Sequence, residues 1–427
     1  MSEDQMSVRD GVRAWLAEHW DAEARRARAG GTMPEWMDQV MAAGWAVPSW
    51  PKDYWGRGLD KAGVSGVVNE FRKAGAPGAG QDRTNITANT VMQFGSDVLK
   101  RKIIPAFLTG RARQCLLYSE PGAGSDLAAV RTRADRQGDR YVVTGQKVWT
   151  SGAASADYGL LIARTNWDVP KHDGLSFFII GMRQPGIDVR PINQITGDSH
   201  FSEVFLDGAE VPAENIVGAE GQGWKVMQTA LAVERLVMGE GAGERRQGSL
   251  KSNVVSLIDI ARDAGKIDDP VARQQIAQAM AYRHLNALNM LRAKQEMAQG
   301  SASPIMSLGK LAMSRILHED ARVMTRLLGA ESMLDGEANE RAADVNYRTA
   351  NAYMTSIGGG TDQIQRNIIG ERVLGLPREA EADRNVPFLL ASGYADWTMP
   401  EEWRECPRMA KPYSPHLLRE SLIALLR

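Results

Sequence analysis

Hydrophobic and polar residues follow two different periods along this chain, and the period changes twice. Over the first 115 or so residues, apolar positions recur at helical spacing, as in VRDGVRAWLAEHWDAEARRA. Between about 116 and 220 the apolar runs are short, rich in β-branched and aromatic residues, and separated by turn residues, which is typical of strands. From Gly223 onward the helical spacing returns in long segments, and a break is expected at DAGKIDDPVARQ.

The middle region predicts at least five strands. Their sequences are RYVVTGQKVWTSG, YGLLIART, LSFFIIGM, IDVRPI and SEVFLDGAEVP. Helices followed by strands and again by helices indicate an α+β protein, because a doubly wound sheet requires strands and helices to alternate. We expect a helical domain at 1–115, a β domain at 116–220, helices at 221–380 and a less regular extension at 381–427.

Composition and charge exclude several classes of protein. The chain has 427 residues, of which 43% are hydrophobic and 24% charged, as in an ordinary globular protein. A net charge of -1 gives no sign of a nucleic-acid partner. Cys115 and Cys406 form no CxxC pair, so neither a disulfide framework nor a thiolate zinc site is expected. The polar amino terminus and the short apolar runs predict a soluble, cytoplasmic protein.

Several common catalytic motifs are missing from the sequence. It contains no GxGxxG after a strand, no GxxxxGK[ST], no HExxH and no GxSxG, and its six histidines lack the spacing of metal ligands. Most readings as a hydrolase, a metalloenzyme or a Rossmann dehydrogenase therefore lose their usual support, and no metal site is expected.

Three segments point instead to one family. They are LLYSEPGAGSDLAAV, GQKVWTSGA and GGGTDQIQRNIIGERVLGLPRE, and together they resemble the acyl-CoA dehydrogenases, FAD enzymes that oxidise the α,β bond of an acyl-CoA thioester. The resemblance extends over nearly the whole chain. It implies an amino-terminal helical domain, a central β-barrel-like domain and a carboxy-terminal four-helix bundle. It also implies a homodimer or homotetramer, with a hetero-oligomer as an alternative, and an electron-transfer flavoprotein as electron acceptor.

The phosphate end of FAD needs backbone N–H donors and small residues. GAGSD offers Gly124 and the hydroxyl of Ser125 for the pyrophosphate, although a plain glycine-rich turn explains this segment equally well. By resemblance, Thr361 and Gln363 reach the adenosine end, often of a neighbouring subunit. Many relatives hold that end with an Arg-x-x-Phe-Gly segment, and this chain has ARDAGKIDDPVARQQIA instead. The adenosine end is therefore held differently, or the subunits pair differently.

The flavin ring has its own candidate contacts. By resemblance, Tyr118 and Ser119 lie along the isoalloxazine edge, Trp149 packs on its face and Ser151 lies near the reactive N5. Trp149 and Ser151 are two residues apart, so a regular strand would direct both side chains to the same side. The alternative for Trp149 is an ordinary core aromatic residue.

The reaction requires a carboxylate base and donors for the growing enolate oxygen. Many relatives place the base as the glutamate of a Tyr-Glu-Gly-Thr segment, which aligns with Gly358–Thr361 here. Gly359 therefore occupies the position of the base and cannot act as one, although its backbone N–H is expected to donate to the thioester oxygen. A minority of relatives place the base on an earlier helix, before an arginine, and the matching residues are Glu234 and Arg235.

The segment VMQTALAVERLVM supports Glu234 independently of the family. At about 3.6 residues per turn, Glu234 falls between two apolar stripes, and its helical neighbours are Ala230, Leu231, Val237 and Met238. Burial there would raise the pKa of the carboxyl group towards that of a general base. The alternative is a structural ion pair with another helix. Arg235 is expected at the CoA moiety or, alternatively, on the solvated surface, and Asp362 and Glu371 are expected as helix amino-terminal and surface charges.

Substrate and activity follow as hypotheses. Glycine at Gly358 and Gly359 removes bulk where the acyl group enters, which predicts a wide pocket and a branched or cyclic acyl-CoA, for example a steroid-derived one. Two other functions stay open. One is a catalytically silent subunit of a hetero-oligomer, which the glycines and the missing Phe-Gly segment favour and the intact flavin motifs and Glu234 oppose. The other is a flavin oxidase or monooxygenase on the same fold.

Overall fold

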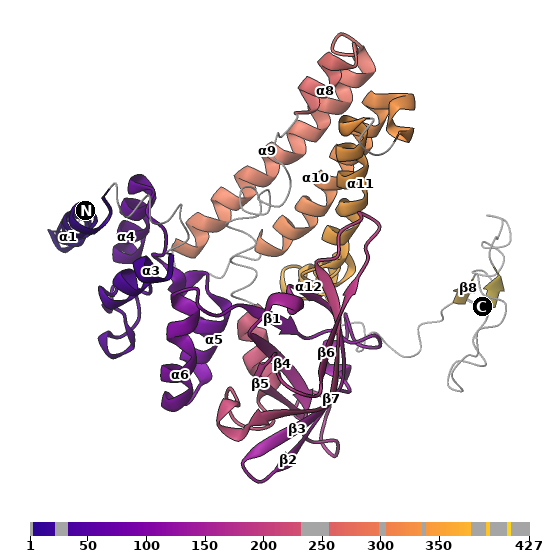
Figure 1. Cartoon of the computed structure of the whole chain (residues 1–427). Coiled ribbons are helices and arrows are strands. Elements are labelled where there is room, and N and C mark those ends of the chain that lie inside the picture. The colour runs from indigo at the N-terminus through magenta and orange to yellow at the C-terminus, as the bar shows by residue number, and fades with distance from the viewer. Residues whose placement is uncertain are drawn as a thin grey trace. The chain divides into compact units, whose positions relative to one another are not determined.

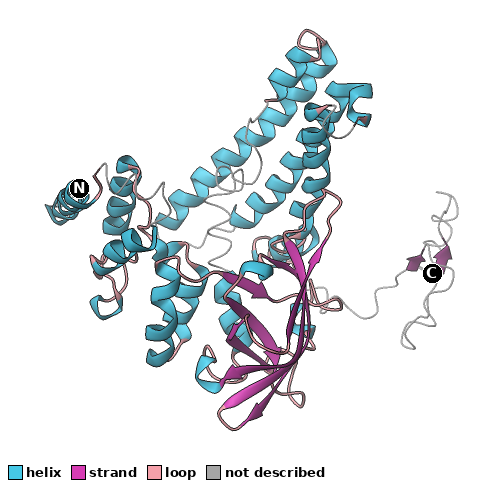
Figure 2. Cartoon of the chain, in the orientation of Figure 1, coloured by secondary structure: helices cyan, strands magenta, loops and turns pink. Residues whose placement is uncertain are grey.

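The computed structural model describes residues 3–21, 33–231, 256–298, 305–334, 339–376, 390–392 and 408–410 (Figure 1). These residues fall into two compact units, Met1–Asp362 and Gln363–Arg427, and each unit is described by itself. Helices come first, strands second and helices third along the chain, so the predicted fold class is confirmed (Figure 2). Within the described ranges, no helix is long and apolar enough to cross a membrane.

The first region of the chain is helical. Its helices are α1 (Glu3–His19), α3 (Met33–Ala42), α4 (Lys61–Ala74), α5 (Ile86–Phe94) and α6 (Asp97–Leu108). Side chains at three helix starts accept a backbone N–H, and these caps are Asp60 for α4, Asn85 for α5 and Ser96 for α6. Aromatic residues such as Trp20, Trp36 and Phe71 fill the core between α1, α3 and α4.

The central region forms one mixed sheet with strand order β1-β4-β2-β3-β7-β6, and β5 pairs with β4. The strands are β1 (Gln114–Leu117), β2 (Arg133–Gln137), β3 (Arg140–Ser151), β4 (Tyr158–Arg164), β5 (Leu175–Gly181), β6 (Ile187–Ile192) and β7 (Phe201–Pro212). The five predicted strands correspond to β3 to β7. The sequence analysis did not identify β1 and β2, and β1 begins just before the point where the β domain was expected to start.

The sheet separates two hydrophobic cores, and β4 contributes to both. Leu160 and Ile162 belong to the core that α5 and α6 share with the sheet, whereas Leu161 and Ala163 belong to the core on the other face. This is the period of two expected for a strand with both faces buried. The core shared with the helices also contains Tyr118, so it extends directly to the end of β1.

The last region is helical again. A helix covers 223–231, followed by α8 (Leu257–Asp263), α9 (Pro270–Ala298), α10 (Ile305–Leu328), α11 (Glu340–Ile357) and α12 (Asp362–Arg372). The predicted break at DDP is confirmed, because Asp269 accepts the N–H groups of Val271 and Ala272 at 2.8 and 2.9 Å as α9 begins. Helices α8 to α11 share one hydrophobic core. In the second unit, β8 (Leu390–Ser392) pairs in parallel with β9 (Arg408–Ala410).

Candidate active site

The segment that follows β1 carries the first two candidate flavin contacts. Tyr118 is buried, and its ring meets Phe177 of β5 edge-on at 6.0 Å between centroids. Ser119 is half-buried, and its carbonyl accepts the N–H of Val148 in β3 at 2.9 Å. The segment after β1 is therefore tied to β3, which carries the next two candidates.

Strand β3 is irregular where it presents Trp149. The register with β7 shifts between Lys147 and Thr150, and Trp149 has a φ of 60°, in the left-handed region that non-glycine residues rarely adopt. Its indole is 58% exposed and meets Phe201 edge-on. Ser151 is also exposed. Both side chains reach the surface, but strict alternation does not explain this, because a β-bulge lies before Thr150.

The EPGAGSD segment offers open backbone. Reciprocal hydrogen bonds between the backbones of Glu120 and Ala123, at 3.0 and 3.1 Å, close a turn. Neither Gly122 nor Gly124 has a positive φ, and a Cβ built on either residue meets no atom within 4 Å. Neither backbone strain nor crowding inside the described chain therefore requires these glycines. A group that approaches the backbone closely would explain them, and the exposed Ser125 adds a hydroxyl beside it.

The glycine triplet forms a turn between α11 and α12. The N–H of Gly358 donates to the carbonyl of Met354 at 2.8 Å and completes the carboxy-terminal cap of α11. Gly359 and Gly360 follow with φ values of 68° and 86°. All three glycines are exposed. Glycine is thus favoured here by the backbone itself, a reason independent of pocket width.

The residues after the triplet are held in part by α10. Asp362 lies in the first turn of α12, as expected for a helix amino-terminal charge, and its carboxylate also pairs with Lys310 of α10 at 2.8 Å. Thr361 is half-buried beside it. Gln363 is exposed and belongs to the second compact unit.

The helix over 223–231 leads towards the predicted base. Val226, Met227 and Ala230 are buried, and Leu231 packs against the same core, as the two apolar stripes require. A Cβ on Gly223 would lie 2.6 Å from the backbone of Ser176, so this helix starts in close contact with the sheet. Glu234 and Arg235 lie outside the described residues, and their roles stay predictions.

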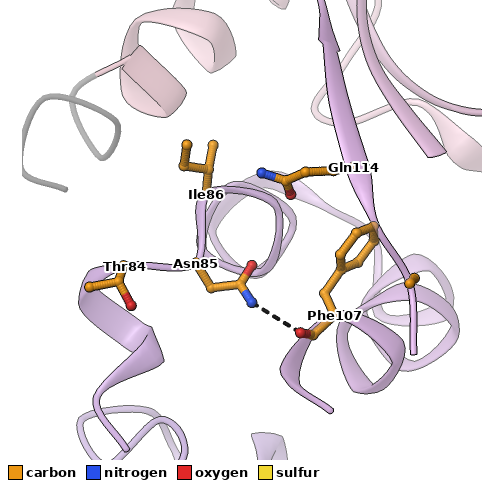
Figure 3. Close-up of a pocket in the computed structure, with 6 residues that line it drawn as sticks. Thr84, Asn85, Ile86, Phe107 and Gln114 are labelled. Atoms are coloured by element: carbon orange, nitrogen blue, oxygen red, sulfur yellow. Dashed lines mark hydrogen bonds between the residues drawn. The ribbon is translucent and has the colours of Figure 1, made fainter. Parts of the chain in front are cut away.

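A cavity of about 260 Å³ lies between α5, the end of α6 and the start of β1. Its lining is mixed, with Ile86 and Phe107 beside the polar residues Thr84, Asn85 and Gln114 (Figure 3). The amide of Asn85 donates to the carbonyl of Phe107 at 3.2 Å. Gln114 begins β1 and Tyr118 directly follows its last residue, so the two are four residues apart, which is about 13 Å of extended chain.

A buried ion pair between Lys147 and Glu120 was not predicted from the sequence. Lys147 of β3 is fully buried, and its ammonium group lies 2.9 Å from the carboxylate of Glu120. Burial lowers the pKa of Lys147 to about 8, although the attraction of Glu120 opposes this change. The pKa of the Glu120 carboxyl, which burial alone would raise, is lowered because Lys147 and hydrogen-bond donors surround it. The only sequence signal was a lysine at an inward-facing strand position.

The residues present fit the FAD that the resemblance implies. An exposed indole, two hydroxyl-bearing side chains and open glycine backbone belong to segments joined by direct hydrogen bonds. Backbone N–H groups and small residues suit a pyrophosphate, and an aromatic face suits a flavin ring. Tyr118, Ser119 and Trp149 are thus brought together through β3.

Three family models match successive parts of the chain. They describe the acyl-CoA dehydrogenase N-terminal domain (residues 2–111), middle domain (115–209) and C-terminal domain (221–374). Among curated proteins, acyl-CoA dehydrogenase IpdE1 of Mycobacterium tuberculosis is 34% identical over 409 residues, covering 89% of this chain and 100% of that protein.

Solved structures give the same assignment. The Tcur3481-Tcur3483 steroid ACAD is 27% identical, with a TM-score of 0.65 and coverage of 88% of this chain and 99% of that one. The ChsE4-ChsE5 complex from Mycobacterium tuberculosis is 30% identical, with a TM-score of 0.62 and the same coverage. This chain therefore belongs to the acyl-CoA dehydrogenase family, FAD-dependent oxidoreductases that act on the CH–CH group.

Proposed function

We propose that this chain oxidises the α,β bond of a bulky, branched or ring-bearing acyl-CoA, with Glu234 as the base. The observation that carries this proposal is the turn at Gly358–Gly360. The position that holds the base in many relatives is a glycine in left-handed backbone, so it supplies no carboxylate. Glu234 is the residue that matches the alternative base position, and the helix that leads to it buries Val226, Met227 and Ala230 as its spacing requires.

The side chains divide the chemistry between them. Glu234 removes the α proton, and apolar neighbours at helical spacing keep water from its carboxylate. The backbone N–H of Gly359 donates to the thioester oxygen as negative charge develops there. FAD, when bound, accepts the hydride that leaves the β carbon. Arg235 contacts the CoA moiety, and Gly358 leaves space for the acyl group.

We assign the cofactor contacts in the same way, with different residues at each part of FAD. Gly124 and Ser125 hold the pyrophosphate through backbone and hydroxyl groups, and Thr361 and Gln363 hold the adenosine end. Tyr118 and Ser119 line the edge of the flavin ring, whereas Trp149 and Ser151 lie at its face and near its reactive nitrogen. The open backbone at Gly124 and the exposed indole of Trp149 support these assignments.

Two observations support a large acyl group. A solved relative that covers 88% of this chain is a steroid ACAD, and steroid ring systems are bulky and cyclic. The cavity beside Gln114 adds about 260 Å³ of space at the far end of the strand that leads to Tyr118. We therefore propose that the rings of the acyl group extend from the flavin contacts towards Gln114.

Assembly and electron transfer complete the proposal. Met280, Leu285, Leu288 and Leu291 of α9 are each about half exposed in the single chain, and an apolar helix surface of this kind favours a protein contact. The solved ChsE4-ChsE5 relative is a complex of two named proteins. We propose that this chain assembles through α9 as a homo- or hetero-oligomer and passes electrons to an electron-transfer flavoprotein.

The deciding experiment compares the wild type with Glu234→Gln. Both proteins are assayed for bound FAD, mixed anaerobically with straight-chain, branched and steroid-like acyl-CoAs, and followed by bleaching of the flavin band. We expect the wild type to bleach fastest with bulky substrates. Glu234→Gln should keep its FAD but bleach about 100 to 10,000 times more slowly, the contribution typical of a general base.

A matched control removes a different glutamate. Glu210 pairs with Arg140 on the exposed part of the sheet, so Glu210→Gln should bleach at the wild-type rate. Near-wild-type bleaching by Glu234→Gln would show that the base lies elsewhere. A wild type that binds no FAD when purified alone would favour a silent subunit, and rapid oxygen consumption by the reduced protein would favour an oxidase.

A further inference from the structure

A single buried ammonium group connects the segments that carry the candidate flavin contacts. The Nζ of Lys147 donates to the carbonyl of Tyr118 at 3.0 Å and to the carboxylate of Glu120 at 2.9 Å, and the lysine has no solvent exposure. Tyr118 precedes Ser119, and Lys147 lies two residues before Trp149. The ammonium group therefore lies between the backbone that carries the ring-edge contacts and the strand that carries the ring-face contact.

The carboxylate of Glu120 extends this connection to a third segment. Its two oxygens accept the N–H of Arg131 at 2.6 Å and the N–H of Thr132 at 2.9 Å. The backbone of Glu120 also closes the turn with Ala123. Arg131 and Thr132, which lie after the EPGAGSD segment, are thus bound to Glu120, the first residue of that segment.

Packing alone does not fix this turn. A cavity of about 330 Å³ borders Glu120, Pro121 and Gly122 on one side and Arg131 and Gly145 on the other. Side chains next to a cavity have fewer contacts to hold them. The hydrogen bonds to the Glu120 carboxylate, the backbone pairing of Glu120 with Ala123 and the ion pair with Lys147 therefore restrain where the turn lies.

The bulge in β3 begins directly after Lys147. The regular pairing with β7 ends at Lys147 and resumes at Thr150, and the intervening Val148 donates its N–H to Ser119 at 2.9 Å. Trp149 then adopts its left-handed backbone and projects its indole outward. The anchored lysine thus fixes the point at which the strand changes direction.

A buried ion pair is weak evidence of a gain in stability, because desolvation of two charges can offset their attraction. We propose that Lys147 and Glu120 are positioning residues for the flavin site, holding Tyr118 and Ser119, the GAGSD turn and Trp149 in one fixed arrangement. This inference rests on the proposed use of that site for FAD.

The test replaces the pair in two ways. Lys147→Met removes the ammonium group at similar length, and the double variant Lys147→Met/Glu120→Gln also removes the negative charge left without its partner. The readouts are the dissociation constant for FAD, the visible circular dichroism of bound flavin and the rate of anaerobic reduction by acyl-CoA at saturating FAD. A misplacement of about 1 Å at a reacting centre can cost about 100-fold in rate. We expect slowing of that order and an altered flavin spectrum in both variants.

Measurements of thermal stability distinguish a positioning role of the ion pair from a role in folding. The double variant should unfold at a higher temperature than Lys147→Met, because it buries no unpaired charge, and its flavin spectrum and rate should stay altered. Glu70→Gln is the matched control: Glu70 is buried and pairs with Arg13 and Lys73 at 2.9 and 3.0 Å in the first helical region. It should lose stability and keep the wild-type flavin spectrum and rate.

If the double variant keeps the wild-type FAD affinity, flavin spectrum and reduction rate, the inference is overturned. The ion pair between Lys147 and Glu120 would then have only a structural role. A failure of the proposed function can be distinguished from a failure of this inference. If the wild type binds FAD but no acyl-CoA bleaches the flavin, the proposed dehydrogenation is contradicted. The FAD affinity and the flavin spectrum of the variants still decide whether Lys147 and Glu120 position the flavin site.

Discussion

The carboxylate of Asp362 lies 2.8 Å from the ammonium group of Lys310, and this ion pair ties Asp362 to α10. Ser314, also on α10 and almost fully buried, places its hydroxyl 2.8 Å from the same carboxylate and 3.2 Å from the carbonyl of Thr355. Both ends of the glycine turn, Thr355 before it and Asp362 after it, are therefore held by one helix.

Removing this carboxylate should weaken the turn. Hydrogen bonds to charged groups contribute about 1.5–3 kcal/mol, and Asp362 is only 18% exposed, so screening by solvent is limited. We expect Asp362→Ala to lower the free energy of unfolding by about 1–3 kcal/mol, and Asp362→Asn, which keeps an acceptor for Ser314, to lower it less. Urea unfolding measures both changes. Equal midpoints for Asp362→Ala and the wild type would show that the pair contributes nothing.

The two adjacent glycines Gly358 and Gly359 should respond differently to alanine. Gly359 has a φ of 68°, where an L-residue costs about 1–2 kcal/mol, whereas Gly358 has a φ of -68° that any residue adopts. A Cβ on Gly358 would lie 3.3 Å from the carbonyl of Met354, a contact that a small shift relieves. We expect Gly359→Ala to lower the thermal midpoint more than Gly358→Ala. The reverse order would mean that crowding, and not backbone conformation, selects glycine here.

The buried lysine predicts a specific dependence on pH. Burial lowers the pKa of Lys147 from 10.5 to about 8, so between these values the unfolded chain binds the proton that the folded chain has released. The contribution of this group to stability therefore rises with pH across that window. Glu120 faces the ammonium group directly, and Arg164 interacts with the same carboxylate.

Two measurements check this dependence. The difference in unfolding free energy between the wild type and Lys147→Met should change between pH 8 and 10 in the direction that favours the wild type. The flavin spectrum of the wild type should also titrate near pH 8, and that of Lys147→Met should not. A wild-type spectrum that stays constant from pH 7 to 9.5 would contradict the assigned pKa.

The cavity at the start of β1 predicts a change in substrate preference. If bulky acyl groups extend to this cavity, Gln114→Phe should fill part of it and lower kcat/KM for ring-bearing acyl-CoAs by about 10 to 200-fold, the range for a small steric change in a pocket. Short acyl-CoAs should keep their rates, and Gln114→Glu is the size-conserving control. An equal loss for short and bulky substrates would place the cavity outside the acyl site.

Local patterns in the sequence predicted most of the strands but not their irregularities. The strands β4 and β5 are continuous runs of branched and aromatic residues, which the sequence displays directly. Strand β2, with the sequence RADRQ, has one buried residue and forms because its backbone pairs with β3, so its own side chains carry almost no strand signal. The bulge at Trp149 also depends on pairing with a distant strand, β7.

The candidate site likewise contains residues that local sequence motifs predict and contacts that only the tertiary structure reveals. The turn glycines and Trp149 belong to contiguous motifs, and the sequence analysis selected them. The contacts of Lys147 with Glu120 and of Lys310 with Asp362 join residues separated by 27 and 52 positions. From the sequence alone, a lysine and a carboxylate this far apart are expected to be two separate surface charges. Their burial as a pair depends on the tertiary structure, which local sequence patterns do not specify.

The left-handed backbone at Gly359 and Gly360 also bears on how this branch of the family evolves. A mutation that introduced glutamate at position 359 would place a Cβ where the main chain favours glycine, at a cost of about 1–2 kcal/mol before any catalytic gain. On the proposed role of Glu234, the same chain would then carry two candidate bases. A single substitution at position 359 would therefore lower stability before a second carboxylate could contribute to catalysis, and this cost opposes a change from one base position to the other.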